Sequence, residues 1–260
     1  MEFHLTDKLQ YLCEKYDTPL QLYDEKMIRE NVRELIKTFS EKFFFKQFFA
    51  VKALPNPVIL KILLEEGCGL DCSSTSELYI AEKLGVSGEN IMFTSNYTSK
   101  NDLKKALDIN CIINLDDLSL VHDLNDVASQ FPKLISFRLN PGIGKTHSET
   151  SSNILGGPNA KFGISVDNIL EAYKYAKKYG AERFGIHMMT GSCILNNEYW
   201  KESITILINT IKKIEKELEI HFEFINIGGG IGIPYKPEES KININQLTEI
   251  IYQTFVKKKY

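Results

Sequence analysis

The sequence lacks the features that mark several protein classes. No apolar stretch reaches the ~18 residues needed to cross a membrane, and the start, Met1–His4, has no signal-peptide character. The five cysteines are an odd number without a CxxC pair, so neither a disulfide framework nor a metal site is predicted. Lys+Arg 31 against Asp+Glu 34 leaves a net charge of -3 and no long basic run. We therefore expect a cytoplasmic protein that binds neither membranes nor nucleic acid.

The composition is that of a folded globular chain. Hydrophobic residues make up 43% of the 260 residues and charged residues 25%, with a mean hydropathy of -0.19. A core large enough to hold a buried site is compatible with these values. The length is also compatible with one α/β barrel, a fold that typically takes ~250 residues.

Short apolar runs alternate with longer amphipathic segments along the chain. The short runs are rich in Phe, Ile and Val, which is typical of buried parallel strands. Seven strands are predicted: Phe48–Val51, Cys68–Asp71, Ile91–Thr94, Cys111–Asn114, Leu134–Arg138, Phe184–Met188 and Phe224–Ile227.

The segments between the strands have apolar residues at i, i+3 and i+4, which predicts helices. Gly85, Gly180 and the Pro55-Asn56-Pro57 stop are interpreted as turn and cap signals between elements. The predicted helices are Glu25–Thr38, Val58–Leu64, Ser76–Leu84, Asp102–Leu107, Leu118–Val127, Val166–Tyr179, Glu198–Leu218 and Gln246–Val256.

This alternation indicates a parallel sheet, either open and doubly wound or closed as a (β/α)₈ barrel. An open sheet would have a glycine-rich fingerprint after its first strand, and Lys52–Pro57 is not one, so we favour the barrel. A barrel needs about eight strands and seven are recognisable, so either an eighth strand escapes recognition or the chain stops before its barrel closes. We expect one domain over residues 1–260, with seven βα units over about 45–260.

Candidate functional residues lie where the predicted strands end, which is where barrels place their chemistry. A lysine in a dry pocket has a lowered pKa and becomes a nucleophilic amine, the requirement for a Schiff base with an aldehyde cofactor. Consecutive glycines after the seventh strand allow backbone N–H groups to point at a phosphate. The candidates are Lys52, Asp71, Arg138, His187 and the run Gly228, Gly229, Gly230.

Each candidate also has a simpler interpretation. Lys52 would extend to solvent from a strand end, and Asp71 would cap the next helix unless Ser73 or Ser74 does so. Arg138 would pair with a neighbouring carboxylate, and a lone strand histidine such as His187 is more often structural. The glycine run would form a turn without a ligand.

An ordered set of motifs resembles the fold-type III pyridoxal phosphate (PLP) decarboxylases, most closely the diaminopimelate decarboxylases and more distantly ornithine decarboxylase. The matches run through almost the whole chain, and their order is more specific than any one motif. They are Tyr16–Leu20, Ala50–Ala53, Pro55–Pro57, Gly67–Ser74 with Glu77-Leu78, Asn90–Thr94, Ile112–Asp116, Arg138–Gly142, Lys161–Ile164, Gly191-Ser192 and Ile227–Tyr235.

The resemblance implies a PLP-binding TIM-type barrel, alanine racemase-like, that decarboxylates meso-diaminopimelate to L-lysine in lysine biosynthesis. It implies that Lys52 holds the cofactor, that Asp71 and Arg138 position it, and that Ser192 and Gly228–Gly230 hold its phosphate. The family's site lies at a dimer interface, so a homodimer or a complementary C-terminal fragment is the expected partner. Ornithine, arginine or another diamino acid remains an alternative substrate.

The chain departs from the family pattern at two points. The family places a ring-stacking histidine three residues before the serine of its Gly-Ser pair, where Met189 stands here; His187 shares its face and is a candidate substitute. The family's Glu-Pro-Gly-Arg segment, its catalytic cysteine and a late tyrosine are not found. We therefore expect the front part of a longer enzyme, without a C-terminal β domain. A single-domain PLP carrier and an inactive decarboxylase-like binding protein are the alternatives.

Overall fold

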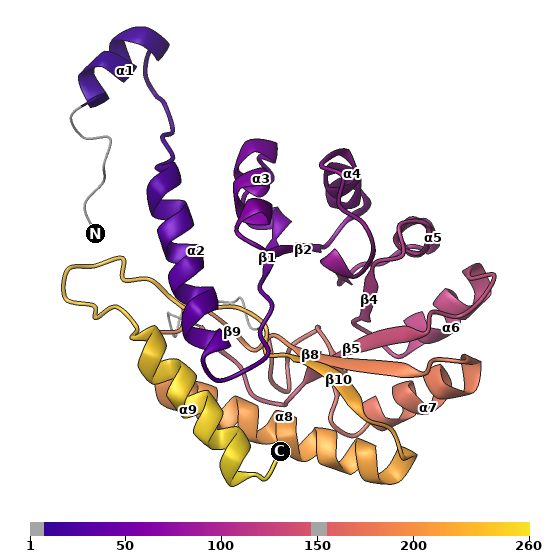
Figure 1. Ribbon diagram of the computed structural model, residues 1–260. Coiled ribbons are helices and arrows are strands. Elements are labelled where there is room, and N and C mark those ends of the chain that lie inside the picture. Colours follow the sequence, from indigo (N-terminus) through magenta and orange to yellow (C-terminus); the bar gives the residue numbers. More distant parts are fainter. Residues whose placement is uncertain (1–7, 147–154) are drawn as a thin grey trace.

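The computed structural model describes residues 8–146 and 155–260, and its centre is a parallel sheet (Figure 1). Seven strands follow one another in the order β1-β2-β3-β4-β5-β8-β10. All seven predicted strands are confirmed, with ends shifted by one or two residues. They are β1 (Phe48–Ala50), β2 (Gly69–Cys72), β3 (Ile91–Ser95), β4 (Ile112–Leu115), β5 (Leu134–Asn140), β8 (Arg183–Met188) and β10 (Phe222–Asn226).

Helices surround this sheet, and the eight predicted ones are confirmed (Figure 1). An additional N-terminal helix, α1 (Leu9–Tyr16), has no buried residue and stands away from the sheet. In the described part of the chain no helix has the length and apolarity to span a bilayer. The others are α2 (Glu25–Ser40), α3 (Pro57–Glu65), α4 (Thr75–Lys83), α5 (Lys100–Asp108), α6 (Ser119–Val127), α7 (Ile169–Tyr179), α8 (Asn197–Leu218) and α9 (Ile244–Lys257).

The Pro55–Pro57 segment separates the turn after β1 from α3 and caps that helix, which confirms its interpretation as a signal between elements. The Asn56 side chain accepts hydrogen bonds from the backbone N–H groups of Val58 and Ile59, at 3.0 and 3.4 Å. Pro57 is the first helical residue, where its missing N–H costs nothing because that group has no partner within a helix. The segment therefore fixes the residue at which α3 begins.

Three two-residue strands lie in loops where no strand was predicted. β6 (Lys145–Thr146) pairs in parallel with β9 (Gly191–Ser192), and β7 (Ile164–Ser165) pairs with β5. Two residues are too few to form a periodic pattern, so only tertiary pairing defines these strands. The β6–β9 pair joins the loop after β5 to the segment that follows β8.

The strands do not form a closed ring within the described residues, because β1 and β10 are the two edges of the sheet. The helices do meet across this opening: Phe43, after α2, packs against Tyr252 and Phe255 of α9, with ring centroids 5.9 and 5.8 Å apart. The expectation of an incomplete (β/α)₈-type barrel is confirmed.

The inner face of the sheet changes from apolar to polar along the strands. Met92, Ile112 and Leu134 are buried at the floor of the barrel together with the rings of Phe48 and Phe224. Residues two positions further along a strand face the same side. Those positions form a polar layer above the floor: Asp71, Thr94, Asn114, Ser136, His187 and Asn226.

Candidate active site

The carboxyl ends of the strands place the candidate residues above this polar layer. Lys52 lies in a short 3₁₀ turn, Val51–Ala53, directly after β1. Val51 is fully buried and anchors the turn, whereas Lys52 is exposed. The dry pocket expected for Lys52 is therefore wrong for the described residues.

Asp71 lies on β2, and its Oδ1 atom is buried without a hydrogen-bond partner among the described residues. Burial raises the pKa of Asp71 to about 6, and the Thr94 hydroxyl and the charges of Lys52 and Arg138 oppose that rise. The simpler interpretation of Asp71 as a helix cap is wrong, because the Ser74 side chain caps α4. Asp71 therefore remains available to a ligand.

Glu77, in the first turn of α4, bonds to the turn that follows β2 and was not predicted as a site residue. Its carboxylate accepts hydrogen bonds from the Ser73 N–H at 2.9 Å and from the Ser73 and Ser74 hydroxyls at 3.1 Å. These bonds fix the turn between β2 and α4. The Ser-Ser-x-x-Glu spacing, Ser73 to Glu77, is the sequence signal that could have identified it.

Arg138, near the end of β5, is buried and pairs with a carboxylate, as its simpler interpretation predicted. Its Nη1 lies 3.0 Å from Oδ1 of Asp116, and both side chains are about 5% exposed. Burial raises the pKa of Asp116 and lowers that of Arg138, while the opposite charge of each partner resists the change. The Nε atom of Arg138 is buried and has no partner in the described structure.

His187 is buried in the polar layer and hydrogen-bonded to neighbouring strands. Its Nδ1 lies 3.1 Å from the Asn114 side-chain amide, whose oxygen accepts a bond from the Ser136 hydroxyl at 2.7 Å. Burial lowers the pKa of His187 to about 3, with added repulsion from Arg138 and Lys52. The imidazole is therefore neutral at physiological pH.

The glycine loop after β10 lies against the segment that follows β8. Gly228 and Gly230 have φ angles of 75° and 94°, and a Cβ at either would lie 2.2 Å from the carbonyl oxygen of Met188 or Gly191. Only glycine permits this backbone and this approach. Ser192, half-buried in β9, lies beside the loop, since a Cβ added at Gly230 would be 3.5 Å from the Ser192 Cα.

The structure thus brings the predicted residues together in two groups. In the first group, Lys52 and Arg138 each lie within electrostatic reach of both Asp71 and His187. Ser192 lies with Gly228–Gly230 at the neighbouring strand ends. The first group offers an amine, a carboxyl group and a guanidinium, and the second offers a hydroxyl and backbone N–H groups. Together they suit a ligand with an electrophilic carbon and an anionic group.

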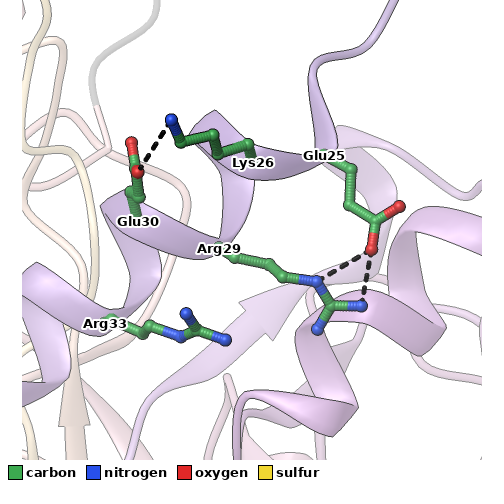
Figure 2. A pocket seen from close by; sticks show the side chains of 5 residues that line it. All are labelled: Glu25, Lys26, Arg29, Glu30 and Arg33. Atoms are coloured by element: carbon green, nitrogen blue, oxygen red, sulfur yellow. Dashed lines mark hydrogen bonds and ion pairs between the residues drawn. The ribbon is translucent and has the colours of Figure 1, made fainter.

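A surface hollow of about 500 Å³ lies elsewhere, along the outer side of α2 (Figure 2). Its arginines are already paired: Arg29 with Glu25, Glu65 and Glu66, and Arg33 with Glu66. These pairs join α2 to α3. The hollow is therefore a stabilising ion-pair surface rather than a part of the site.

Comparison with known families identifies the part of the chain that carries these features. Residues 26–258 match the family described as pyridoxal-dependent decarboxylase, pyridoxal binding domain. The match begins at α2 and includes every strand of the sheet.

Individual relatives are longer than this chain. Protein TabA of Pseudomonas amygdali pv. tabaci is 36% identical over 244 residues, and the diaminopimelate decarboxylase of Methanothermobacter thermautotrophicus is 38% identical over 245. Both alignments cover 94% of this chain and 56% of the relative, so the chain spans a little over half their length. The crystal structure of diaminopimelate decarboxylase from Helicobacter pylori complexed with L-lysine superposes with a TM-score of 0.83 at 26% identity, covering 95% of this chain and 63% of that one.

Proposed function

The chain belongs to the family of pyridoxal-dependent decarboxylases, and from this premise we propose that it binds pyridoxal 5'-phosphate and serves the decarboxylation of meso-diaminopimelate to L-lysine and CO₂. The archaeal diaminopimelate decarboxylase and the L-lysine held by the Helicobacter enzyme support this substrate over ornithine or arginine. Because the chain spans 56% of its curated relatives, the proposal concerns the share of the site that this barrel supplies.

The observation that carries the proposal is that three polar atoms of the candidate site and its polar layer, Asp71 Oδ1, Arg138 Nε and Thr94 Oγ1, are buried without partners in the described residues. Buried polar groups normally have a hydrogen-bond partner, so such atoms mark a place where a polar ligand fits. The Lys52 amine lies within electrostatic reach of Asp71. These residues fit an aldehyde cofactor that also carries anionic oxygens.

When bound, pyridoxal phosphate supplies the sink for the electron pair of the broken C–C bond. The residues of this chain do the rest. Lys52 provides an accessible amine as nucleophile. Asp71 balances the positive charge of Lys52 and, with its pKa near 6, exchanges a proton close to neutral pH. His187 stays neutral and adds no charge beside Lys52 and Arg138.

The phosphate is assigned to Ser192 and the backbone of Gly228–Gly230. The Gly229 N–H donates to the Met189 sulfur at 3.3 Å, and a thioether is a weak acceptor. A phosphate oxygen would replace that sulfur with a charge-assisted hydrogen bond. Gly229 has no atom within 4 Å of an added Cβ, so space for the phosphate exists beside it.

We assign the remaining part of the site to a partner, either a second copy or a complementary C-terminal fragment. The edge strands β1 and β10 offer unpaired backbone groups to a further strand. A partner would cover the cofactor and exclude water from it.

The test is cofactor binding followed by trapping. The purified chain is titrated with pyridoxal phosphate, the visible absorbance is recorded, and the complex is reduced with borohydride and mapped by mass spectrometry. We expect the label on Lys52 and its loss in Lys52→Ala. Lys161→Ala, an exposed lysine on the loop that reaches Arg138, is the matched control and should keep the label.

Release of CO₂ from meso-diaminopimelate is then measured with the chain alone and with the C-terminal fragment of a relative added. Turnover in either case supports the proposal. Cofactor binding without turnover in both would assign the chain to the carrier or inactive binding proteins. A folded sample that binds no cofactor would contradict the proposal itself.

A further inference from the structure

Asp116 lies directly after β4, and three separate parts of the chain contact its carboxylate. Arg138 Nη1 lies 3.0 Å from Oδ1, and the Asn96 side-chain amide donates to the same oxygen at 3.2 Å. The Gly163 N–H donates to Oδ2 at 3.2 Å. Asp116 is only 5% exposed. It therefore joins β5, the loop after β3 and the loop that leads into β7.

The Arg138 guanidinium is held on its other sides as well. Its Nη2 donates to the carbonyl oxygens of Leu155 and Met189, at 3.3 and 3.5 Å. The Phe162 ring lies 5.0 Å from its central carbon, in the range of a cation–π contact. Only the buried Nε has no partner among the described residues. The buried Nε–H is thus left for a ligand.

The two contacts of Nη2 with backbone carbonyl oxygens are long and therefore weak. The contact of Nη1 with Asp116 is shorter, and both of its partners carry a charge. A buried guanidinium needs a counter-charge in direct contact, and Asp71 acts on Arg138 only at longer range. The bond to Asp116 is therefore the strongest restraint on the orientation of the guanidinium plane.

We propose that Asp116 is the positioning residue for Arg138, holding the guanidinium in the orientation that leaves its Nε–H to the bound cofactor. This inference rests on the proposed function for the identity of the ligand. It assigns to Asp116 a role through Arg138 rather than a contact of its own. The Asp116–Arg138 pair is then one unit of the cofactor site.

The test compares Asp116→Asn with Asp117→Asn in the free and cofactor-bound chain. Asparagine keeps the shape and one oxygen at position 116 but removes the charge. Asp117 is an exposed neighbour whose carboxylate bonds the Ser119 N–H at 2.8 Å, a role that asparagine can fill. We expect pyridoxal phosphate affinity to fall about 10- to 100-fold in Asp116→Asn, as when groups that orient metal ligands are lost, and to stay unchanged in Asp117→Asn.

A double-mutant cycle separates positioning from a purely structural role. In the Arg138→Gln background there is no guanidinium to orient, so Asp116→Asn should cause no further loss of affinity. An equal loss in both backgrounds would show that Asp116 acts through the fold and would overturn the inference. Unchanged affinity in Asp116→Asn alone would also overturn it.

A second readout does not depend on the cofactor. In the free chain labelled with ¹⁵N-arginine, the Arg138 Nε–H resonance is assigned by its absence in Arg138→Gln. It should shift in Asp116→Asn and stay in place in Asp117→Asn; an unmoved resonance contradicts the inference even if the proposed function fails. If Asp116→Asn does not fold, Asn96→Ala replaces it, because it removes one hydrogen bond to the Asp116 carboxylate. It should shift the Arg138 Nε–H resonance to a smaller extent, and an unmoved resonance in that variant would contradict the inference.

Discussion

The barrel floor depends on a missing side chain at Gly185, and Gly185→Ala tests this directly. Gly185 faces inward from β8 beneath the ring of Phe224 on β10. An added Cβ would lie 2.1 Å from Cζ of Phe224 and 2.3 and 2.5 Å from the two Cε atoms. Carbon atoms in contact are ordinarily ~3.5–4.0 Å apart. The ring would have to move by about 1.5 Å to restore that separation.

That movement is resisted because the ring packs against Met92, Ile112 and Leu134. Overpacking of this kind costs about 1–3 kcal/mol of unfolding free energy. For a domain of this size the expected fall in Tm is about 2–12 °C. Shortening the ring should relieve the clash, so Phe224→Leu is expected to recover part of the loss in the Gly185→Ala background.

The assay is urea unfolding followed by circular dichroism on the two single variants and the double variant. Gly229→Ala serves as the control, because no atom lies within 4 Å of its added Cβ, and its unfolding free energy should stay within about 0.5 kcal/mol. Wild-type stability of Gly185→Ala would refute the reasoning. So would a double variant that loses the full sum of the two single effects.

Two further predictions concern buried polar groups. The fully buried Tyr173 hydroxyl donates to the Gly185 carbonyl at 2.7 Å, so Tyr173→Phe should cost about 1–1.5 kcal/mol in the same urea assay; an unchanged midpoint would contradict this. The pKa of His187 is lowered to about 3 in the folded chain, whereas in the unfolded chain it is about 6.5. Between these two pH values the unfolded chain binds a proton at this residue and the folded chain does not. Stability is then fully present above about pH 6.5 and is lost as pH falls toward about 3, by up to about 1.4 kcal/mol per pH unit. His187→Gln should flatten this dependence in unfolding curves measured from pH 7 to pH 4, and an equally steep loss would show that other groups cause it.

Much of the fold could be predicted because its signals are local. Each strand is a short apolar run and each helix an amphipathic one, so the two periodicities are readable without any tertiary contact. The same holds for Asn56 and Pro57, where a cap and a following proline indicate a helix start. The strands β6 and β9 carry no such local signal, and they exist only because two loops meet.

The candidate site was only partly predictable. Lys52, Asp71, Arg138 and His187 stand at or near strand ends, and strand ends converge in any parallel barrel. Their surroundings could not be inferred in the same way. The exposed position of Lys52 differs from the dry pocket expected, because exposure depends on what covers a residue from other parts of a chain.

The sequence by itself determined the parallel α/β organisation, the seven strands and the chemistry of the strand ends, since periodicity and residue type are local properties. Tertiary structure alone decided which of those groups are partnered. Asp116 is an ordinary acidic residue in the sequence, yet folding buries it against Arg138 from the next strand, 22 positions away. Burial and partner choice set the charge and orientation of both groups, and they arise only when distant segments pack together.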